Sequence, residues 1–312
     1  MGLFGKKDPC AICGEKVKAL FPYKIEGHLI CNSCHGITDL PSGLEKSMTL
    51  ADFRGYIAFR EENAKLKQKF NIMQDIDFGW FDTKFVFDLS NGLFCLDKNL
   101  EKTIFEGKHI TSFVIKEDAS PLFEGSSTGL CRHKSAVPDR LATMMPQIEQ
   151  MRMQEQMRRS MEQLADSLVK DREKTYTPRL NIPEPFKVFN VEIHLQHPYW
   201  SIIKADMSGP TFNNEYPDAN NYLNQYNDNV LLMEQLAMAL MGVAFPTVSS
   251  DPISAENFAA SINTNPSVPN RSVPTSNNVD VVEELQRYKS LLDLGILTEE
   301  EFSAKKRQLL GI

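Results

Sequence analysis

The chain contains 312 residues, of which 42% are hydrophobic and 24% charged, and its formal net charge is −7. This length has room for two or three folded units, and the composition is ordinary for soluble globular protein. The acidic balance argues against a protein that coats nucleic acid or an anionic membrane along its whole length. No stretch approaches the ~18–20 consecutive apolar residues of a membrane span, so no transmembrane segment is expected.

Residues 1–48 are expected to form a metal-binding module. Two C-x-x-C pairs, Cys10 with Cys13 and Cys31 with Cys34, are separated by 17 residues. This is the spacing of a four-thiolate zinc site, in which each pair supplies two corners of a tetrahedron with metal–sulfur bonds of roughly 2.3 Å. The spacing therefore predicts that all four cysteines are metal ligands.

The chemistry of these cysteines indicates a structural site. A closed shell of four thiolates has no open position for water or substrate, which argues against catalysis at the metal. Zinc is the expected cofactor, and iron is a lesser alternative for the same ligands. His28 and His35 lie close enough to replace a thiolate, but we expect them to be exposed or to sit outside the ligand shell. Closely spaced cysteine pairs favour metal thiolates over disulfides, which indicates a reducing cytoplasm.

Two short strands, at 17–23 and 28–30, are expected between the cysteine pairs, with a turn at Glu26-Gly27. This order fits a zinc ribbon or a treble clef. A helix over 49–70 is then expected to connect the module to the next domain, with Thr49 as its N-cap. The apolar face of this helix consists of Phe53, Tyr56, Ile57, Leu66 and Phe70.

Residues 71–244 are expected to form a β-rich central domain. Strands are predicted at aromatic or β-branched runs and at one alternating run, namely 80–81, 84–89, 93–96, 112–115 and 186–195. Ser90-Asn91-Gly92 is the clearest hairpin signal. A helix over 219–243 closes the domain. The order of elements predicts a small barrel or curved sheet capped by this helix.

A long helical arm at 139–174 is inserted into this domain. The segment contains no glycine, and only Pro146 interrupts it. It is rich in methionine, at positions 144, 145, 151, 153, 157 and 161. A Met-rich helix can be an adaptable binding surface. We favour the alternative that the methionines pack on the domain itself or on a second copy of the chain.

The remaining chain is expected to divide into a linker and a helical hairpin. Five prolines among Ser, Asn and Thr residues predict a flexible linker at 245–278. In 279–312, a helix ending at Gly295 precedes a second helix that Thr298 caps, with Glu301 completing a capping box. About 34 residues bury little surface alone, so this hairpin is expected to need a partner. The predicted interaction residues are apolar, namely Leu285, Leu292, Ile296, Leu297, Phe302 and Leu309.

Two segments resemble known families. The run LGILTEEEF at 294–302, with its flanks from 285 to 310, is similar to the SHOCT domain, a short bacterial module. That resemblance implies oligomerisation or tethering rather than chemistry. The four cysteines and the helical segment 50–70 resemble a bacterial zinc-ribbon family, DUF4428, which implies a zinc site and no assigned activity. The central domain resembles a pleckstrin-homology-like (PH-like) domain through its order of elements.

These features favour an α+β multidomain, non-enzymatic zinc-binding assembly protein of a bacterium or phage. Its partner is expected to be a second copy or another protein, bound through the C-terminal hairpin. The sequence has no phosphate-cradling glycine loop, nucleophile elbow or metalloprotease motif. Cys95 and Cys131 are interpreted as core residues, and His109 and His133 have no recognisable nucleophile or carboxylate pattern.

Two other classes of function stay open. The first is a nucleic-acid-binding regulator, because the module carries several lysines and two aromatic residues, Phe21 and Tyr23, that can stack on bases. It is less favoured because Asp8, Glu15 and Glu26 dilute the positive charge and the module has no arginine. The second is a membrane-surface adaptor that acts through the PH-like domain.

Overall fold

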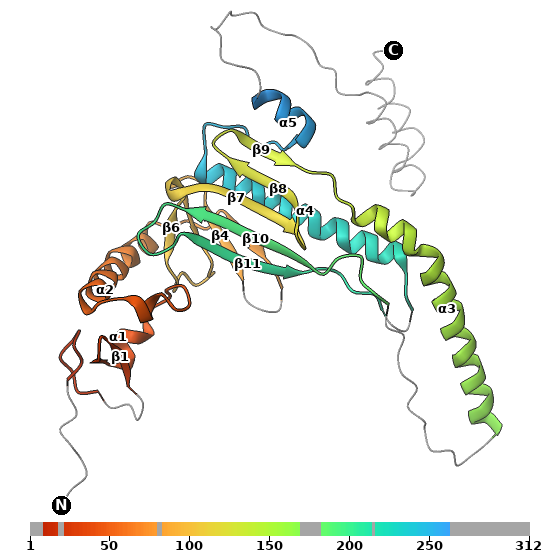
Figure 1. Cartoon of the computed structure of the whole chain (residues 1–312), viewed down its shortest axis with the longest axis horizontal. Coiled ribbons are helices and arrows are strands. Elements are labelled where there is room, and N and C mark those ends of the chain that lie inside the picture. The colour runs from red at the N-terminus through yellow and green to blue at the C-terminus, as the bar shows by residue number, and fades with distance from the viewer. Residues whose placement is uncertain (1–8, 18–21, 80–82, 169–181, 214–215, 263–312) are drawn as a thin grey trace, which may run out of the picture. The chain divides into compact units, whose positions relative to one another are not determined.

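The computed structural model describes residues 9–17, 22–79, 83–168, 182–213 and 216–262. The chain divides into two compact units, Met1–Thr264 and Asn265–Ile312, and all described residues belong to the first. The described part is mixed α+β (Figure 1). The predicted hairpin over 279–312, its six interaction residues and the predicted strand 80–81 lie outside the described residues.

The N-terminal module is built on a two-stranded antiparallel sheet of β1 (Tyr23–Ile25) and β2 (His28–Ile30). The predicted turn joins them, and Gly27 has φ 83°, a left-handed conformation that favours glycine. The short helix α1 (Asn32–Gly36) follows β2, and the 3₁₀-helix η1 (Leu44–Ser47) leads toward the next helix. This order places the second cysteine pair directly after the hairpin.

The predicted connecting helix is α2 (Leu50–Ala64), which continues as the 3₁₀-helix η2 (Lys65–Gln68). Thr49 caps it as predicted, since its hydroxyl accepts a hydrogen bond from the Asp52 N–H and the Asp52 carboxylate accepts one from the Thr49 N–H. Three residues of the predicted apolar face are buried, namely Phe53, Tyr56 and Ile57. The other two, Leu66 and Phe70, are partly buried against a small separate cluster.

A four-stranded antiparallel sheet follows. Its strands, in spatial as well as chain order, are β3 (Gln74–Asp77), β4 (Lys84–Asp88), β5 (Leu93–Cys95) and β6 (Ile104–Glu106). The predicted hairpin at residues 90–92 joins β4 and β5, where Asp88 pairs with Leu93. Asp88 holds this turn because its carboxylate accepts hydrogen bonds from Ser90 and Asn91.

A six-stranded sheet has the spatial order β11-β10-β7-β8-β9-β12. Its strands are β7 (Ile110–Glu117), β8 (Ser120–Ser126), β9 (Gly129–Arg132), β10 (Val188–Leu195), β11 (Ile202–Ser208) and β12 (Ile253–Ser254). Every second residue of β10 is buried, as its alternating sequence predicts. The 3₁₀-helix η3 (Gly107–His109) joins the two larger sheets.

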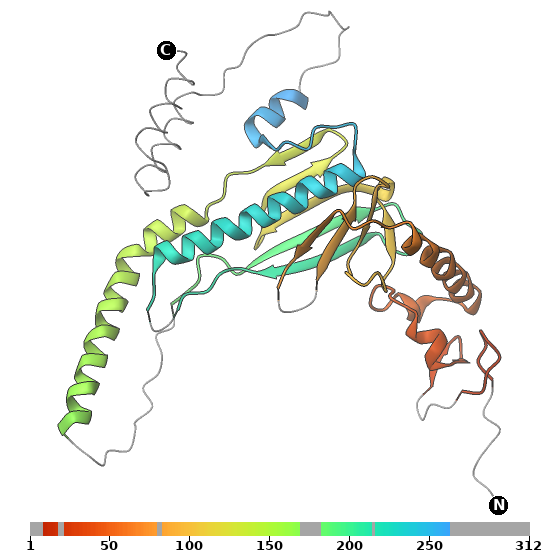
Figure 2. The ribbon, with the colours of Figure 1, turned by 180° about the vertical axis from the view of Figure 1, so that it is seen from behind.

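The closing helix is α4 (Ala219–Ala244), close to its predicted bounds. It packs against strands of both larger sheets and against η3, and Figure 2 shows it along one face of the six-stranded sheet. Gly107 allows this approach, because a Cβ there would lie 2.1 Å from the Val243 carbonyl oxygen. Buried residues of the metal module, both larger sheets and α4 form one continuous apolar cluster.

The long arm is α3 (Val137–Leu168), which passes through Pro146 without ending. It begins two residues before the predicted start, and the predicted continuation over 169–174 lies outside the described residues. Its methionines do not share one environment. Met144 and Met151 are partly buried against the core, whereas Met145, Met153, Met157 and Met161 are exposed. Packing on the chain's own domain, the first of the two predicted placements, therefore holds for only part of the set.

Residues 245–262, the first half of the predicted linker, are more ordered than their composition suggests. They contain β12 and the helix α5 (Ala255–Ile262). β12 pairs in parallel with β9, Ile253 opposite Cys131, so backbone pairing with an open sheet edge gives this polar segment its structure. Among the described helices, none has the length and apolar character needed to cross a bilayer.

Candidate metal centre

The structure brings the four cysteines together. The sulfur atoms of Cys10, Cys13, Cys31 and Cys34 all lie within 4.8 Å of one another, and those of Cys13 and Cys31 are 3.6 Å apart. A tetrahedron with metal–sulfur bonds of roughly 2.3 Å has edges of about 3.8 Å between sulfurs. The donor set could therefore hold a metal ion that prefers four thiolates.

Backbone amides surround these sulfurs and favour their charged form. The N–H groups of Ile12 and Cys31 point at the Cys10 sulfur at 3.4 and 3.3 Å, and that of Cys34 points at the Cys31 sulfur at 3.4 Å. Burial acts to raise the pKa of the Cys10 thiol, but the hydrogen bonds it accepts outweigh burial and lower the pKa to about 6. Burial and the neighbouring sulfurs raise the pKa of Cys34. A bound cation would offset the repulsion between neighbouring thiolates and so stabilise all four sulfurs in the charged form that metal ligation requires.

The two nearby histidines do not join the sulfur cluster. His28 is exposed at the start of β2. His35 stacks on Tyr23, with ring centroids 4.0 Å apart, and its Nε2 lies 3.6 Å from a Glu45 carboxylate oxygen. Glu45 also accepts hydrogen bonds from the Tyr23 and Thr38 hydroxyls, at 2.6 and 3.0 Å. His35 thus belongs to a polar cluster that ties α1 to η1.

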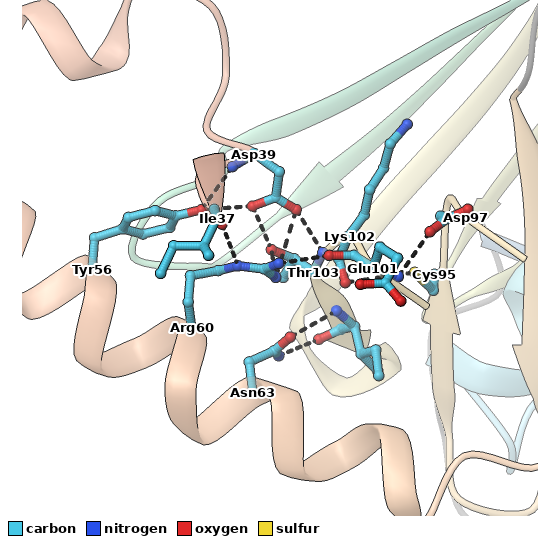
Figure 3. A network of polar contacts seen from close by, with 11 residues as sticks. Ile37, Asp39, Tyr56, Arg60, Asn63, Cys95, Asp97, Glu101, Lys102 and Thr103 are labelled. Atoms are coloured by element: carbon cyan, nitrogen blue, oxygen red, sulfur yellow. Dashed lines mark hydrogen bonds and ion pairs between the residues drawn. The ribbon is translucent and has the colours of Figure 1, made fainter. Parts of the chain in front are cut away.

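A second polar network joins the metal module to the four-stranded sheet (Figure 3). Asp39, just beyond the cysteines, accepts hydrogen bonds from the Tyr56 hydroxyl at 2.6 Å and from the Thr103 backbone N–H and hydroxyl at 2.5 and 2.8 Å. Burial, together with the Asp39 carboxylate, raises the pKa of Tyr56, so this hydroxyl stays a donor at neutral pH. One carboxylate therefore connects the module, α2 and the residue that precedes β6.

Arg60 and Asn63, one turn apart on α2, extend this network. Arg60 donates to the Thr103 hydroxyl at 2.8 Å and to the carbonyl oxygens of Ile37 and Glu101 at 3.1 and 2.8 Å (Figure 3). Asn63 makes a reciprocal pair with the Ile104 backbone, donating at 2.7 Å and accepting at 2.9 Å. The Asn63 bonds are buried and the Arg60–Thr103 bond is partly buried, whereas the bonds to the two carbonyl oxygens are exposed. The buried and partly buried bonds fix the orientation of the module on the sheet domain.

Sequence reasoning did not identify this junction. The only available signal was the i, i+3 spacing of Arg60 and Asn63 on a helix whose other buried residues are apolar. Their partners lie about 40 residues away along the chain, and no local pattern marks Thr103 or Ile104 as acceptors or donors.

A cavity of about 830 Å³ opens beside Asp39, between the loop after α1 and β11. Its lining combines apolar side chains with two lysines, Lys102 and Lys204. Trp200 and Phe105 form part of its wall but are only 6% and 5% exposed. These two aromatic rings therefore offer a ligand little surface.

The remaining cysteines and histidines contain no nucleophile–base pair of productive geometry. Cys95 and Cys131 are buried, as predicted. His133 does lie beside a thiol and a carboxylate, which corrects the sequence interpretation, because β8 and β9 pair Glu124 with Cys131. However, Cys131 and Glu124 both approach the same His133 nitrogen, at 3.7 and 2.8 Å, and burial raises the pKa of the thiol. A catalytic triad would need the thiol on one ring nitrogen of the histidine and the carboxylate on the other.

Two family models match parts of the chain. Residues 9–56 match DUF4428, a domain of unknown function, and residues 283–310 match SHOCT, a short C-terminal domain. Both matches confirm the resemblances seen in the sequence. No curated protein and no solved structure matches the chain, so the PH-like resemblance stays a prediction. The DUF4428 match contains all four cysteines and ends before Arg60, whereas the SHOCT match lies outside the described residues.

Proposed function

We propose that this chain is a non-enzymatic interaction protein that binds zinc through Cys10, Cys13, Cys31 and Cys34 and self-associates or docks on a protein partner through its SHOCT segment. The close four-sulfur cluster carries the first half of this proposal. Zinc prefers this donor set and, when bound, cross-links the two cysteine pairs. The closed thiolate set leaves no place for a substrate, which supports a structural role for the ion.

The junction on α2 gives the metal-stabilised module a mechanical role. Asp39 and Arg60 hold the module against the four-stranded sheet through partly buried hydrogen bonds. A surface on the module is therefore presented in a fixed orientation relative to the sheet domain. That rigidity suits an adaptor that engages more than one partner at once, because little ordering entropy is lost on binding.

A nucleic-acid-binding function receives less support. Tyr23, one of the two aromatic residues that can stack on bases, is hydrogen-bonded to Glu45 and stacks on His35. Exposed Lys16 is followed by a buried residue and preceded by exposed Glu15, so its charge is locally balanced. Binding that weakens steeply with salt would favour this function, and flotation with liposomes would favour the membrane-adaptor alternative.

Removal of the SHOCT segment tests the proposal. Sedimentation equilibrium of the full chain and of a chain ending at Asn278 should show weaker self-association in the shorter chain. The thermal transition of the central domain should stay in place, because its core lies within the first unit. An unchanged oligomer size, together with an unchanged set of proteins captured from lysate, would show that the segment does not mediate assembly.

A further inference from the structure

The helix α3 has two faces, and among the described residues the chain covers only one of them. On the inner face, Leu141 and Ile148 are buried in the core beside α4. Further along the same face, Arg159 bonds to Glu155 at 3.0 Å and to the Tyr216 hydroxyl at 2.8 Å, and its guanidinium lies over the Tyr216 ring. The inner face is thus occupied well into the second half of the helix.

The outer face carries a stripe of methionines. Met153, Met157 and Met161 are spaced by four residues, and Met157 lies about 200° around the helix from Glu155. These side chains are 69%, 71% and 66% exposed, although the inner face of the same turns is covered. Figures 1 and 2 show the first turns of α3 beside α4 and the later turns, which carry the stripe, beyond it. Contiguous exposed apolar surface of this kind marks an interaction site.

The surroundings of the stripe select the kind of partner. In the turns around the stripe, the polar residues that lie within about 60° of Met157 around the helix are uncharged, namely Gln150, Gln154 and Ser160. The charged residues of these turns form ion pairs within the helix, Arg158 with Glu155 and Glu162, and Arg152 with Glu149. A strongly charged partner, such as the SHOCT segment with its acidic and basic runs, gains no complementary charge here. A second copy of the stripe is apolar and neutral along its whole length.

We propose that the outer face of α3 binds the same face of α3 in a second copy of the chain. In a symmetric dimer Met157 lies nearest the twofold axis. Methionines four residues apart form a single ridge, and two such ridges interdigitate at a crossing angle of about −50°. A parallel coiled coil is disfavoured because Ser160 occupies the position where a heptad starting at Met153 and Met157 needs an apolar residue.

The size of the stripe sets the expected strength of the contact. Each copy contributes a few hundred Å² of apolar surface. Two such patches with their glutamine flanks approach the roughly 1,000 Å² below which specific interfaces are rare. We therefore expect a dissociation constant in the micromolar range. This contact does not depend on the SHOCT segment, and its test changes α3 alone.

Sedimentation velocity of the full chain across the micromolar range tests the contact. The triple variant M153Q/M157Q/M161Q keeps side-chain length and helix propensity while removing the apolar stripe, and it should weaken self-association at least about tenfold. Met73→Gln is the matched control, because Met73 is a 53% exposed methionine away from α3 and should leave association unchanged. Equal association in the triple variant and the parent, or a monomeric parent, overturns the proposal.

Cross-linking provides a second readout that does not depend on other contacts between copies. In the full chain carrying Met157→Cys, mild oxidation should give a disulfide between two copies, identified by mass spectrometry as a pair of M157C peptides. Adding M153Q and M161Q should abolish it. An M157C thiol that is protected from a maleimide in a monomeric chain would show that the chain covers its own stripe, which also overturns the proposal.

Discussion

The metal module and the two-sheet domain bury very different amounts of apolar surface. The described part of the module up to residue 48 has five buried apolar residues, namely Cys10, Val17, Ile25, Ile30 and Cys31. Two of these five, Cys10 and Cys31, are metal-ligand candidates. The sheet domain buries a long row of aromatic residues, including Phe85, Phe87, Phe94 and Phe105 on one sheet. The sheet domain can therefore fold by burial alone, whereas the module buries too little to do so and is expected to need the proposed metal and its attachment to the domain.

The largest expected effect comes from removing the metal ligands. The double variant C31S/C34S should lose bound zinc and all hydrogen-exchange protection in the module, because zinc binding contributes about 10–16 kcal/mol to the folding of zinc-finger peptides. Protection in β7, β10 and α4 should persist. Ser33→Ala, an exposed change between the two ligands, is the control. Unchanged metal content measured by mass spectrometry would refute the four-cysteine site.

The junction tests whether the two regions are coupled. Arg60→Ala should lower the free energy of unfolding by about 2–3 kcal/mol, because it removes the partly buried hydrogen bond to the Thr103 hydroxyl and leaves the partly buried Asp39 carboxylate without its cationic partner. Arg54→Ala is the control, since Arg54 is on the same helix but, among the described residues, bonds within the module, to the Ala11 carbonyl. Urea denaturation measures both. Equal losses in the two variants would mean that the junction adds nothing specific.

Acid should destabilise the sheet domain through His197, whose ring contacts Phe59 of α2 and Phe105 of β6. Burial and the charge of His109 lower the pKa of His197 to about 4, against the opposing influence of Glu106. The unfolded chain, with a histidine pKa of about 6.5, then binds more protons, so stability falls as pH drops from about 6.5 to about 4. The full shift corresponds to about 3 kcal/mol, and solvent screening of this partly exposed ring reduces it to about 1–2.

The variant His197→Asn should flatten this part of the stability curve. Its oxygen can still accept the hydrogen bond that the Tyr199 N–H gives to the ring nitrogen of His197. Denaturant melts at several pH values between about 4.5 and 6.5 provide the measurement. An identical slope in the variant and the parent would assign the acid sensitivity to other groups.

The smallest expected effect is at the start of α2. Thr49→Ala removes the hydroxyl of the capping box and should cost about 1 kcal/mol, whereas Thr49→Ser keeps the cap and should cost little. The loss should appear in the unfolding of the module, because the cap lies at its boundary. A loss confined to the sheet domain would show that α2 belongs energetically to that domain instead.

Local patterns predicted the four-cysteine cluster and most elements. The four cysteines are close along the chain, the alternation of β10 repeats every two residues, and the buried residues of α4 repeat with helical period. The family resemblances rest on the same local motifs, and both are confirmed.

The features that the sequence did not predict are of two kinds. Some depend on partners that are distant along the chain, and others distinguish residues of the same type. The Asp39–Thr103 contact spans 64 residues and uses common polar side chains. The inner and outer methionines of α3 have the same chemistry, so composition alone could not separate those that contact the core from those that do not. The strand β12, which contains Ile253, lies in a polar stretch of the sequence. Its extended conformation comes from backbone pairing with β9.

The separation of Asp39 from Thr103 along the chain also causes a delay during biosynthesis, between synthesis of the metal module and synthesis of the residue on which it docks. At about 5–20 residues per second, a ribosome needs roughly 3–13 seconds to add the 64 residues between them. During this interval the cysteine pairs are already synthesised, while the sheet that anchors the module does not yet exist. Capture of the proposed zinc ion can therefore precede docking. On that proposal, a shortage of zinc during translation would leave an unfolded N-terminal segment when Thr103 emerges.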